Sequence, residues 1–430
     1  AEEKKIEEVI SVSSKVPIKQ VETNSTIDVI EKQDLTRLAS KDFIGVLSGY
    51  LGLDTSNNGG LGQYSSVFLR GSNSNHTLVK VNGVKINPST AGGASINNVD
   101  PSLISRIEIG SGPFSATHGS EAIGGVINIY TFPDEHESSL KLSGSRGVNN
   151  YRRESLKKNW VNQDSSLSIF LLKAKSDGFP SLINSSINSG YKNKSFGGTY
   201  ASEKNKTKIN MSSWVSKGQT EYLDFQSNPL SQNYENSAHT VNFMYEHKDP
   251  YLVFLNLATS KDLINQNQLN YLDRKDTTET DNHNLQLKIY SPIDRDFSYV
   301  MGYEHEKQKV NYSSFGTQFL KNIQTISFLI ENKIKIKNSL VGINLRLSDH
   351  DSYGSNKSWN IGYKKNLNQQ WILRFNRGSA FRSPNSSELY GYSSNLKLIP
   401  EISSGQELGV EKITDDSNFS LVAFSNKIKN

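Results

Sequence analysis

From about Ser138 to the end of the chain, apolar and polar residues alternate with a period of two, interrupted by polar turns. Val241, Phe243 and Tyr245 alternate with polar neighbours, and so do Leu285 and Leu287. Because successive side chains of a strand point to opposite faces, each such segment has one apolar and one polar face. The pattern predicts about fifteen β-strands of roughly 9–12 residues each.

The first 132 residues or so have a mixed pattern, in which short β-branched runs alternate with glycine-rich turns. A helix is predicted from Ser40 to Leu51, with Ser40 as its N-cap. The dipeptide Asn82-Gly83, placed between two apolar runs, predicts a β-hairpin. This part of the chain is therefore expected to form a compact, turn-rich α+β domain in front of an all-β body.

Alternation alone does not say which face of the strands is buried. A membrane barrel turns its apolar face outwards and a soluble lectin-like sandwich turns it inwards. Strands of the predicted length can cross a bilayer at a tilt. Long polar connections are expected at 218–236, 262–280 and 308–321, alternating with short ones, and aromatic residues lie near strand ends, at Trp160, Tyr251, Tyr290, Tyr299 and Trp371. These features favour an outer-membrane barrel.

Composition narrows the classes of function. Lys and Arg exceed Asp and Glu by 48 − 43 = 5, with both signs interspersed, so no nucleic-acid footprint is present. The absence of cysteine excludes disulfides and Cys-ligated metal sites. The sequence contains no run of about 18 apolar residues, so it predicts no transmembrane helix. The sequence holds no H-E-x-x-H, P-loop or G-x-S-x-G motif, so we expect no enzyme and no required cofactor.

Several motifs carry a resemblance to a known family. They are 59–71 (GGLGQYSSVFLRG), 81–87 (VNGVKIN) and 116–129 (ATHGSEAIGGVINI), with a weaker match at 381–391 (FRSPNSSELYG) and 406–409 (QELG). On these motifs the chain resembles the TonB-dependent outer-membrane receptors, and among them most of all the cobalamin (vitamin B12) receptors.

The resemblance implies a mainly β fold: a transmembrane antiparallel β-barrel of a 22-stranded family with an N-terminal α+β plug domain inside the lumen. The implied division is an N-terminal extension at 1–20, a plug at 21–134 and the barrel at 135–430. About fifteen strands and the apparent stop inside a strand lead us to expect that C-terminal strands are missing. The implied location is the bacterial outer membrane, as a monomer.

The implied function is active import of cobalamin or a related corrinoid, driven by TonB with ExbB-ExbD in the periplasm. A ferric-siderophore or other metal-chelate receptor is the alternative within the family. A passive porin or adhesin is the alternative from another class. A porin has neither a plug nor a TonB box, so the first 132 residues distinguish the two.

The family implies a TonB box, an N-terminal segment that adds as a strand to the partner's sheet. Its expected residues are Glu7, Glu8, Val9, Ile10, Ser11, Val12 and Ser13. Plug arginines in this family pair with glutamates of the barrel wall, which implies an ionic lock between Arg70 and Glu407. The family usually has arginine where this chain has Ser111, so a second arm of the lock is in doubt.

Two plug loops, 57–63 and 87–95, are rich in Gly, Asn and Ser and are expected to face the substrate. Their candidate binding residues are Asn58, Leu61, Gln63, Asn87, Ser89 and Thr90. Calcium needs clustered oxygen ligands. The family resemblance implies a calcium site in the second and third extracellular loops, where the candidate ligands are Asp177 and Asp224. Because 184–194 holds no carboxylate, the calcium site looks depleted, which also weakens the cobalamin assignment.

Overall fold

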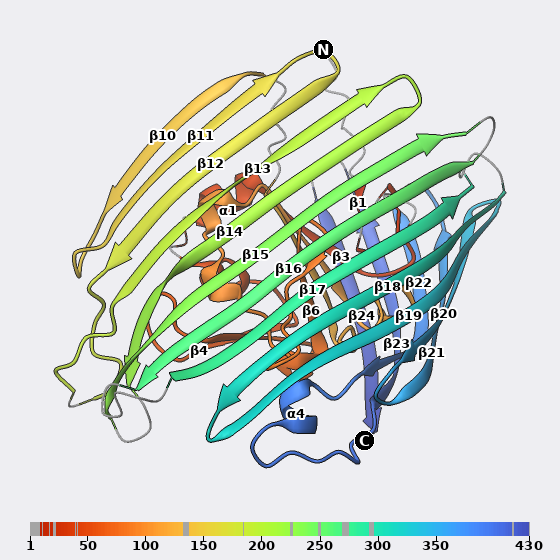
Figure 1. Cartoon of the computed structure of the whole chain (residues 1–430). Coiled ribbons are helices and arrows are strands. Elements are labelled where there is room, and N and C mark those ends of the chain that lie inside the picture. The colour runs from red at the N-terminus through yellow and green to blue at the C-terminus, as the bar shows by residue number, and fades with distance from the viewer. Residues whose placement is uncertain are drawn as a thin grey trace.

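The structure is a computed structural model of the 430-residue chain. It describes residues 9–10, 12–16, 18–19, 23–38, 40, 42–131, 137–183, 185–223, 227–247, 251–268, 275–291, 296–414 and 417–429. The chain forms a long antiparallel sheet, called the wall, which curves into a trough around an N-terminal domain, called the plug (Figure 1).

The wall is one fifteen-stranded sheet in which every strand pairs with its neighbours in sequence. Its strands are β10 (Ser139–Arg146), β11 (Arg152–Val161), β12 (Ser165–Ser176), β13 (Tyr191–Lys204), β14 (Thr207–Leu223), β15 (Pro229–Glu246), β16 (Leu252–Gln268), β17 (Lys275–Tyr290), β18 (Phe297–Ser314), β19 (Thr317–Ile336), β20 (Ser339–His350), β21 (Gly354–Asn366), β22 (Trp371–Arg382), β23 (Glu401–Ile413) and β24 (Asn418–Lys429). The helix α4 (Ser386–Tyr390) lies between β22 and β23. The predicted number of strands is confirmed.

The plug is built on a five-stranded mixed sheet with the order β3-β8-β9-β6-β7. Its elements are β3 (Ile27–Glu31), α1 (Lys32–Leu38), α2 (Phe43–Leu47), β4 (Leu53–Asn57), β5 (Ser65–Leu69), η2 (Ser74–His76), β6 (Thr77–Val81), β7 (Val84–Lys85), η3 (Ile96–Asn98), η4 (Pro101–Leu103), β8 (Arg106–Ser111), α3 (Ser115–His118) and β9 (Gly125–Tyr130). Two short strands, β1 (Val9–Ile10) and β2 (Ile18–Lys19), pair separately. The hairpin predicted at Asn82-Gly83 joins β6 to β7.

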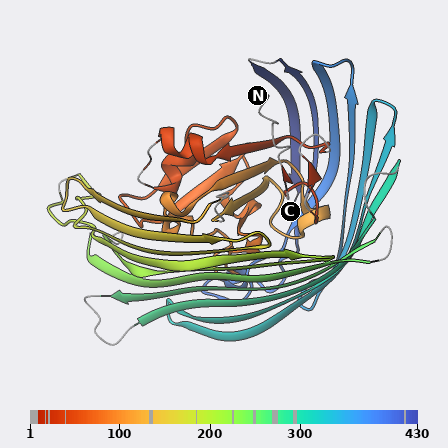
Figure 2. The ribbon, with the colours of Figure 1, turned by 90° about the horizontal axis from the view of Figure 1, so that it is seen from above.

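Seen along the trough, the wall wraps around the plug and leaves the sheet open (Figure 2). Within the described residues, β10 and β24 are the two edges of this sheet and do not pair with each other. The chain therefore forms an open fifteen-stranded sheet. None of the helices among the described residues is long and apolar enough to cross a bilayer.

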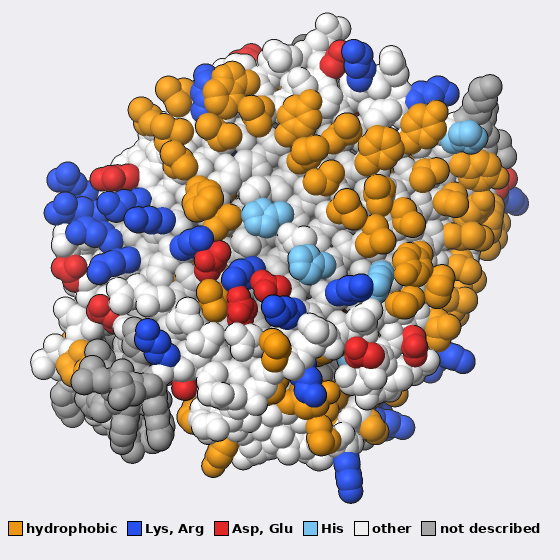
Figure 3. All heavy atoms as spheres, viewed as in Figure 1, with side chains coloured by type: hydrophobic (Ala, Val, Ile, Leu, Met, Phe, Trp, Pro, Cys, Tyr) orange, Lys and Arg blue, Asp and Glu red, His pale blue; other side chains and the backbone are white. Residues whose placement is uncertain are grey.

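The outer face of the wall carries a broad band of apolar side chains (Figure 3). On β19, Ile326, Phe328 and Ile330 are exposed on this face, as expected for a surface in contact with lipid. The inner face is only partly polar, because the first wall strands turn apolar side chains such as Phe170 and Trp214 towards the plug core. The trough is thus packed with protein.

Two predictions about local structure are wrong. The helix runs from Phe43 to Leu47, and its N-cap is Asp42, whose carboxylate accepts a bond of 2.7 Å from the Gly45 N–H. The expected long connections at 218–236, 262–280 and 308–321 are largely strand, since β14 to β19 are 16–20 residues long. Apolar alternation stops at the edge of the lipid layer, whereas the backbone ladder continues beyond it.

Candidate functional site

One of the two predicted substrate loops contacts the inner face of the wall near the ends of β13 and β14. Gln63 is buried and its Nε2 donates to the Glu221 carbonyl oxygen at 2.7 Å. Leu61 packs partly against the plug core, whereas Asn58 is exposed. Gly62 has φ = +74°, and a side chain there would overlap the ring of Tyr191. Glycine therefore allows the plug backbone to approach the wall closely.

The second loop lies against the segment around α4. Asn87 is buried and fully engaged within the plug: its Oδ1 accepts from the Val79 N–H at 2.7 Å, and its Nδ2 donates to the carbonyls of Thr77 and Gly92. Thr90 is also buried. Ser89 is half-buried, with its hydroxyl 2.8 Å from that of Ser386. Among the six candidates, Asn87, Thr90 and Gln63 shape the loops, while Asn58 and Ser89 are more accessible.

The predicted partners Arg70 and Glu407 are in contact. Arg70 Nη1 lies 2.7 Å from Glu407 Oε2, and the two side chains are 11% and 5% exposed. The Arg70 guanidinium also lies over the Phe424 ring, 4.5 Å from its centre. Thr26 donates to the other carboxylate oxygen through both its N–H and its hydroxyl. The plug is thus joined to β23 by a buried, hydrogen-bonded ion pair. Ser111 is buried.

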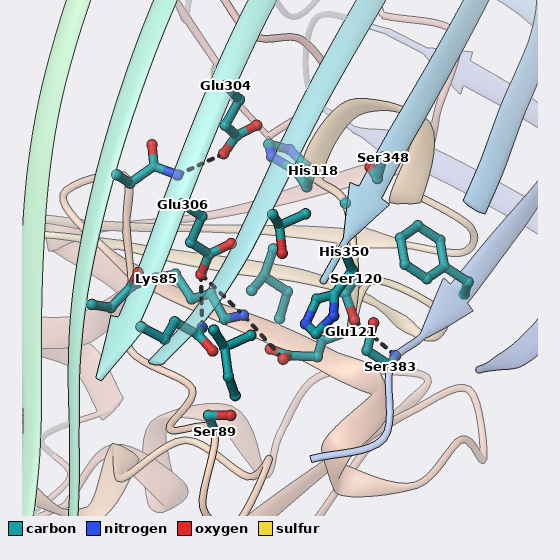
Figure 4. A pocket seen from close by; sticks show the side chains of 18 of the residues that line it. Lys85, Ser89, His118, Ser120, Glu121, Glu304, Glu306, Ser348, His350 and Ser383 are labelled. Carbon is teal, nitrogen blue, oxygen red and sulfur yellow. Dashed lines mark hydrogen bonds and ion pairs between the residues drawn. The ribbon is translucent and has the colours of Figure 1, made fainter. Parts of the chain in front are cut away.

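A polar cavity of about 80 Å³ lies between the plug and the inner face of the wall (Figure 4). That volume has room for several waters. Lys85 Nζ lies 3.0 Å from Glu121 and 3.6 Å from Glu306 of β18, and the three side chains point towards one another. Burial alone would lower the pKa of Lys85, but the carboxylates of Glu121 and Glu306 raise it. The contact between plug and wall here is ionic.

His118 lies at the far side of this cavity and contacts the N-terminal segment. Its Nε2 donates to the Val12 carbonyl oxygen at 2.7 Å, and its Nδ1 is 2.9 Å from Lys80 Nζ. Burial, and then the positive charge of Lys80, hold the pKa of His118 well below its usual value. The pKa of Lys80 is also lowered by burial. The neutral ring therefore fits this position, as a donor to Val12.

Residues 14 and 15 are attached to the wall. Ser14 Oγ donates to Glu331 of β19 at 2.7 Å, and Lys15 Nζ lies 3.1 Å from Glu304 of β18. Lys288 of β17 donates to the Lys15 carbonyl oxygen at 2.8 Å. The segment is held by charged side chains from three adjacent strands.

These contacts place part of the expected TonB box. Val9 and Ile10 pair with β2, and Val12 is 1% exposed, with its N–H donating to Glu108 at 3.1 Å. Ser13 is half-buried, and Glu7, Glu8 and Ser11 lie outside the described residues. The segment is therefore docked against the plug and wall, and Val9 and Ile10 already have a strand partner.

Of the two calcium candidates, the structure describes only Asp177. Asp177 follows the end of β12 and is exposed, and Asp224 lies outside the described residues. Among the residues that the structure does describe, no group of three or more His, Asp or Glu side chains is arranged to hold a metal ion.

Sequence reasoning missed the residues that hold the N-terminal segment, namely Lys15, Glu304 and Glu331. One signal was present: Glu304 and Glu331 occupy positions in β18 and β19 that face the lumen, where a charge needs a partner. The identity of that partner was not readable, because it lies about 300 residues away in sequence.

Two family models match the chain. Residues 19–126 match the TonB-dependent receptor plug domain, and residues 143–430 match the TonB-dependent receptor-like β-barrel. The second match alone covers more than half of the chain.

Curated relatives agree with these matches. The chain is 26% identical over 424 residues to a vitamin B12 transporter BtuB from Vibrio vulnificus (strain YJ016), covering 95% of this chain and 68% of the relative. It is 25% identical over 423 residues to a vitamin B12 transporter BtuB from Photobacterium profundum, covering 96% and 68%. A vitamin B12 transporter BtuB from a second V. vulnificus strain (CMCP6) is 25% identical over 416 residues, covering 91% of this chain and 65% of the relative. The chain thus spans about two thirds of the length of these relatives.

Solved structures of the same fold include siderophore receptors. A mutant of the ferric enterobactin receptor PfeA from Pseudomonas aeruginosa, in complex with enterobactin, matches with a TM-score of 0.80 at 19% identity, over 95% of this chain and 73% of that one. The siderophore receptor PirA from Acinetobacter baumannii matches with a TM-score of 0.80 at 22% identity, over 96% and 71%. At these identities the likeness concerns the fold. From its plug, its wall and the two family matches, the chain belongs to the TonB-dependent receptors of the bacterial outer membrane.

Proposed function

We propose that this receptor imports cobalamin or a related corrinoid, with energy supplied through TonB in the periplasm. The observation that carries the proposal is the arrangement of the plug. Its polar loops meet the wall at one end, through Ser89 and Ser386, while the N-terminal segment is attached at the other end, through Ser14 and Glu331. The curated vitamin B12 transporters, similar over 95% of the chain, support the choice of substrate.

In this proposal the ends of the plug have separate roles. The loops around Asn58 and Ser89 contact the substrate, while Gly62 lets the first of them pack closely against the wall. The segment around Val12 leaves its contacts with Glu108 and His118 and adds to a sheet of TonB. The plug then moves relative to the wall, while the chain itself carries out no chemical conversion.

The polar character of the plug–wall contacts at β18 and β23 supports this movement. Arg70–Glu407 and Lys85–Glu121–Glu306 are ion pairs beside a cavity or a polar lumen. Water entering as the plug is pulled can solvate such groups, whereas a continuous apolar interface would lose much more free energy on separation.

A ferric-siderophore or other metal-chelate receptor is the second candidate. It is favoured by the solved siderophore receptors that share this fold and by the absence of carboxylates from 184–194. A passive porin is disfavoured, because the trough is filled by the plug, whose core is shared with the wall through residues such as Phe170 and Trp214.

The test is a binding screen of the detergent-purified chain against cobalamin, cobinamide and ferric siderophores, with and without calcium. Nanomolar cobalamin binding that does not depend on calcium supports the proposal. Tight binding of a ferric siderophore instead would replace the substrate and retain the transporter class. An Asn58→Ala variant should weaken binding without lowering the unfolding temperature, with Ser56→Ala, at an exposed position of β4 outside the loop, as its neighbouring control.

A further inference from the structure

Lysine and arginine side chains are concentrated on one part of the outer face of the wall. This basic patch consists of Arg152 on β11, Lys173 and Lys175 on β12, Lys192 and Lys194 on β13, and Lys217 on β14. All six are exposed or half-exposed. Figure 3 shows a group of basic side chains gathered at the left, over the lower ends of β11–β13 and beside the end of the apolar band.

The strand register places these like charges directly opposite one another. Lys175 faces Arg152 on one side and Lys192 on the other, and Lys194 faces both Lys173 and Lys217. Directly opposed residues have Cβ atoms about 4.5–5.5 Å apart, and like charges in such positions are destabilising. Carboxylates lie at the borders of the patch: Glu154 is opposite Lys173, and Glu235 pairs with Lys217 at 3.0 Å. An anion from outside the protein would therefore relieve the repulsion between the lysines at the centre of the patch.

The patch begins where the lipid-facing band ends. On β12 the outward positions are Leu167, Ile169 and Leu171, all exposed, and the next two are Lys173 and Lys175. On β13 the exposed Phe196 is followed, in the same direction, by Lys194 and Lys192. Lysine stems can lie along apolar surface while the ammonium groups reach the headgroup layer. The basic patch lies towards the end of the wall that the substrate loops of the plug contact. That end faces the outer leaflet.

We propose that the basic patch binds the phosphate groups of outer-leaflet lipid headgroups. Phosphate oxygens accept several charge-assisted hydrogen bonds at once, so one headgroup can bridge lysines of neighbouring strands. The lipid phosphate supplies the negative charge that the opposed lysines lack. The patch thereby fixes the depth of β11–β14 in the membrane. This inference concerns the outer face and does not depend on which substrate is imported.

The experiment compares two variants of the full chain in non-ionic detergent. The patch variant carries Lys173→Gln, Lys175→Gln, Lys192→Gln and Lys194→Gln. The control variant carries Lys204→Gln, Lys206→Gln, Lys335→Gln and Lys365→Gln, four exposed lysines at the opposite end of the wall. Each removes four positive charges. The unfolding temperature is measured alone, with bisphosphorylated lipid A, with dephosphorylated lipid A and with inorganic phosphate.

Bisphosphorylated lipid A should raise the unfolding temperature of the wild type and of the control, while the patch variant loses at least half of this shift. Dephosphorylated lipid A and millimolar inorganic phosphate should produce no comparable shift. Without lipid, the patch variant should unfold at the same temperature as the wild type or higher, because the repulsion is relieved. An equal lipid-dependent shift in the patch variant overturns the proposal, as does an equal effect of dephosphorylated lipid A or of inorganic phosphate.

A single substitution keeps the test open if the fourfold variant does not fold. Lys194→Glu places a carboxylate between Lys173 and Lys217. It should raise the unfolding temperature in detergent and reduce the shift caused by bisphosphorylated lipid A. A shift as large as that of the wild type would count against the patch as a phosphate site.

Discussion

At the scale of single residues, the contact between Arg70 and Glu407 is the clearest joint of plug and wall. Both side chains are nearly inaccessible, so the pair has lost most of its hydration. A buried pair of this kind adds little net stability, but removal of one partner leaves an uncompensated charge. The pair therefore holds the plug to the wall because separation of the two charges inside the protein costs free energy.

Arg70→Gln should lower the free energy of unfolding by about 3–5 kcal/mol, because Glu407 then remains buried without a cation. The double variant with Glu407→Gln should recover much of this loss, since both charges are gone. Denaturant unfolding of both single variants and the double variant measures the coupling.

The matched control for this double-mutant cycle is Arg37→Gln. Arg37 lies 3.9 Å from Asp34 and is 79% exposed, so its removal should change stability by less than about 1 kcal/mol. A loss in Arg70→Gln no larger than that in Arg37→Gln would show that the Arg70 pair is solvated.

The second prediction at this scale concerns His118, whose lowered pKa makes stability depend on pH. Below about pH 6.5, the unfolded chain takes up a proton on this histidine and the folded chain does not. Stability should therefore fall as the pH drops below that value, by at most about 1.4 kcal/mol per pH unit from this group.

His118→Asn should flatten this part of the profile, measured as the unfolding free energy between pH 7.5 and 5. The exposed His247→Asn is the matched histidine control. If the slopes of wild type and His118→Asn coincide, the buried ring does not remain neutral on acidification.

At the scale of elements, the turns before and after β5 show why particular glycines are needed. Gly62 and Gly71 both have positive φ, +74° and +72°, but only Gly62 lies against another part of the chain. No atom lies within 4 Å of a Cβ built at Gly71, whereas one built at Gly62 overlaps Tyr191. A substitution at Gly71 therefore tests backbone strain alone, whereas one at Gly62 tests backbone strain together with the close contact to Tyr191.

Gly71→Ala should cost about 1–2 kcal/mol, the strain of a left-handed alanine. Gly62→Ala should cost more, because the loop must also move away from β13. Denaturant unfolding measures both, and removal of the buried Tyr191 ring by Tyr191→Ala should cost less in the Gly62→Ala background than in the wild type, because the overlap is then relieved. Equal costs for the two glycines would argue against a tight contact between loop and wall.

Elements also show what the sequence could predict. The period-two pattern predicts about fifteen strands, because successive side chains of a strand point to opposite faces. The outward direction of the apolar faces was inferred from strand length, the alternation of connections and the aromatic residues near strand ends. It predicts β14 to β19 too short, because their ends are polar on both faces and resemble loops. The helix after Ser40 began at a different cap because two residues, Ser40 and Asp42, were both able to accept a bond from the first turn.

The site was less predictable than the fold for a physical reason. Arg70 and Glu407 were paired through a family resemblance, and no local pattern joins them. The contacts of Lys15 with Glu304 and of Ser14 with Glu331 depend on how the N-terminal segment is seated in the trough. Such seating follows from tertiary packing, which alternation along one strand does not encode.

At the scale of the whole molecule, the proposed function requires the plug to move relative to the wall. The cysteine-free chain allows a direct test. Ser89→Cys with Ser386→Cys joins plug to wall where the two hydroxyls are 2.8 Å apart. Oxidation of this pair should abolish import of labelled substrate into cells, and a reductant should restore import.

A tether within the wall provides the control. The hydroxyls of Ser143 and Ser155 lie 2.6 Å apart on β10 and β11, so Ser143→Cys with Ser155→Cys joins two strands that need not separate. This pair should leave import unchanged. Undiminished import with a fully formed plug–wall disulfide would contradict movement of the plug at that point.

The contacts of Glu407 also bear on the order in which the molecule assembles. The plug is made from the beginning of the chain, but Thr26 and Arg70 meet a carboxylate 381 and 337 residues later, on β23. Contacts of such separation form late, because a very long loop must close first. The contacts of Thr26 and Arg70 with Glu407 therefore cannot form until β23, the second-to-last described strand, has been made. Any factor that accompanies the unfinished chain to the membrane meets Arg70 without this partner.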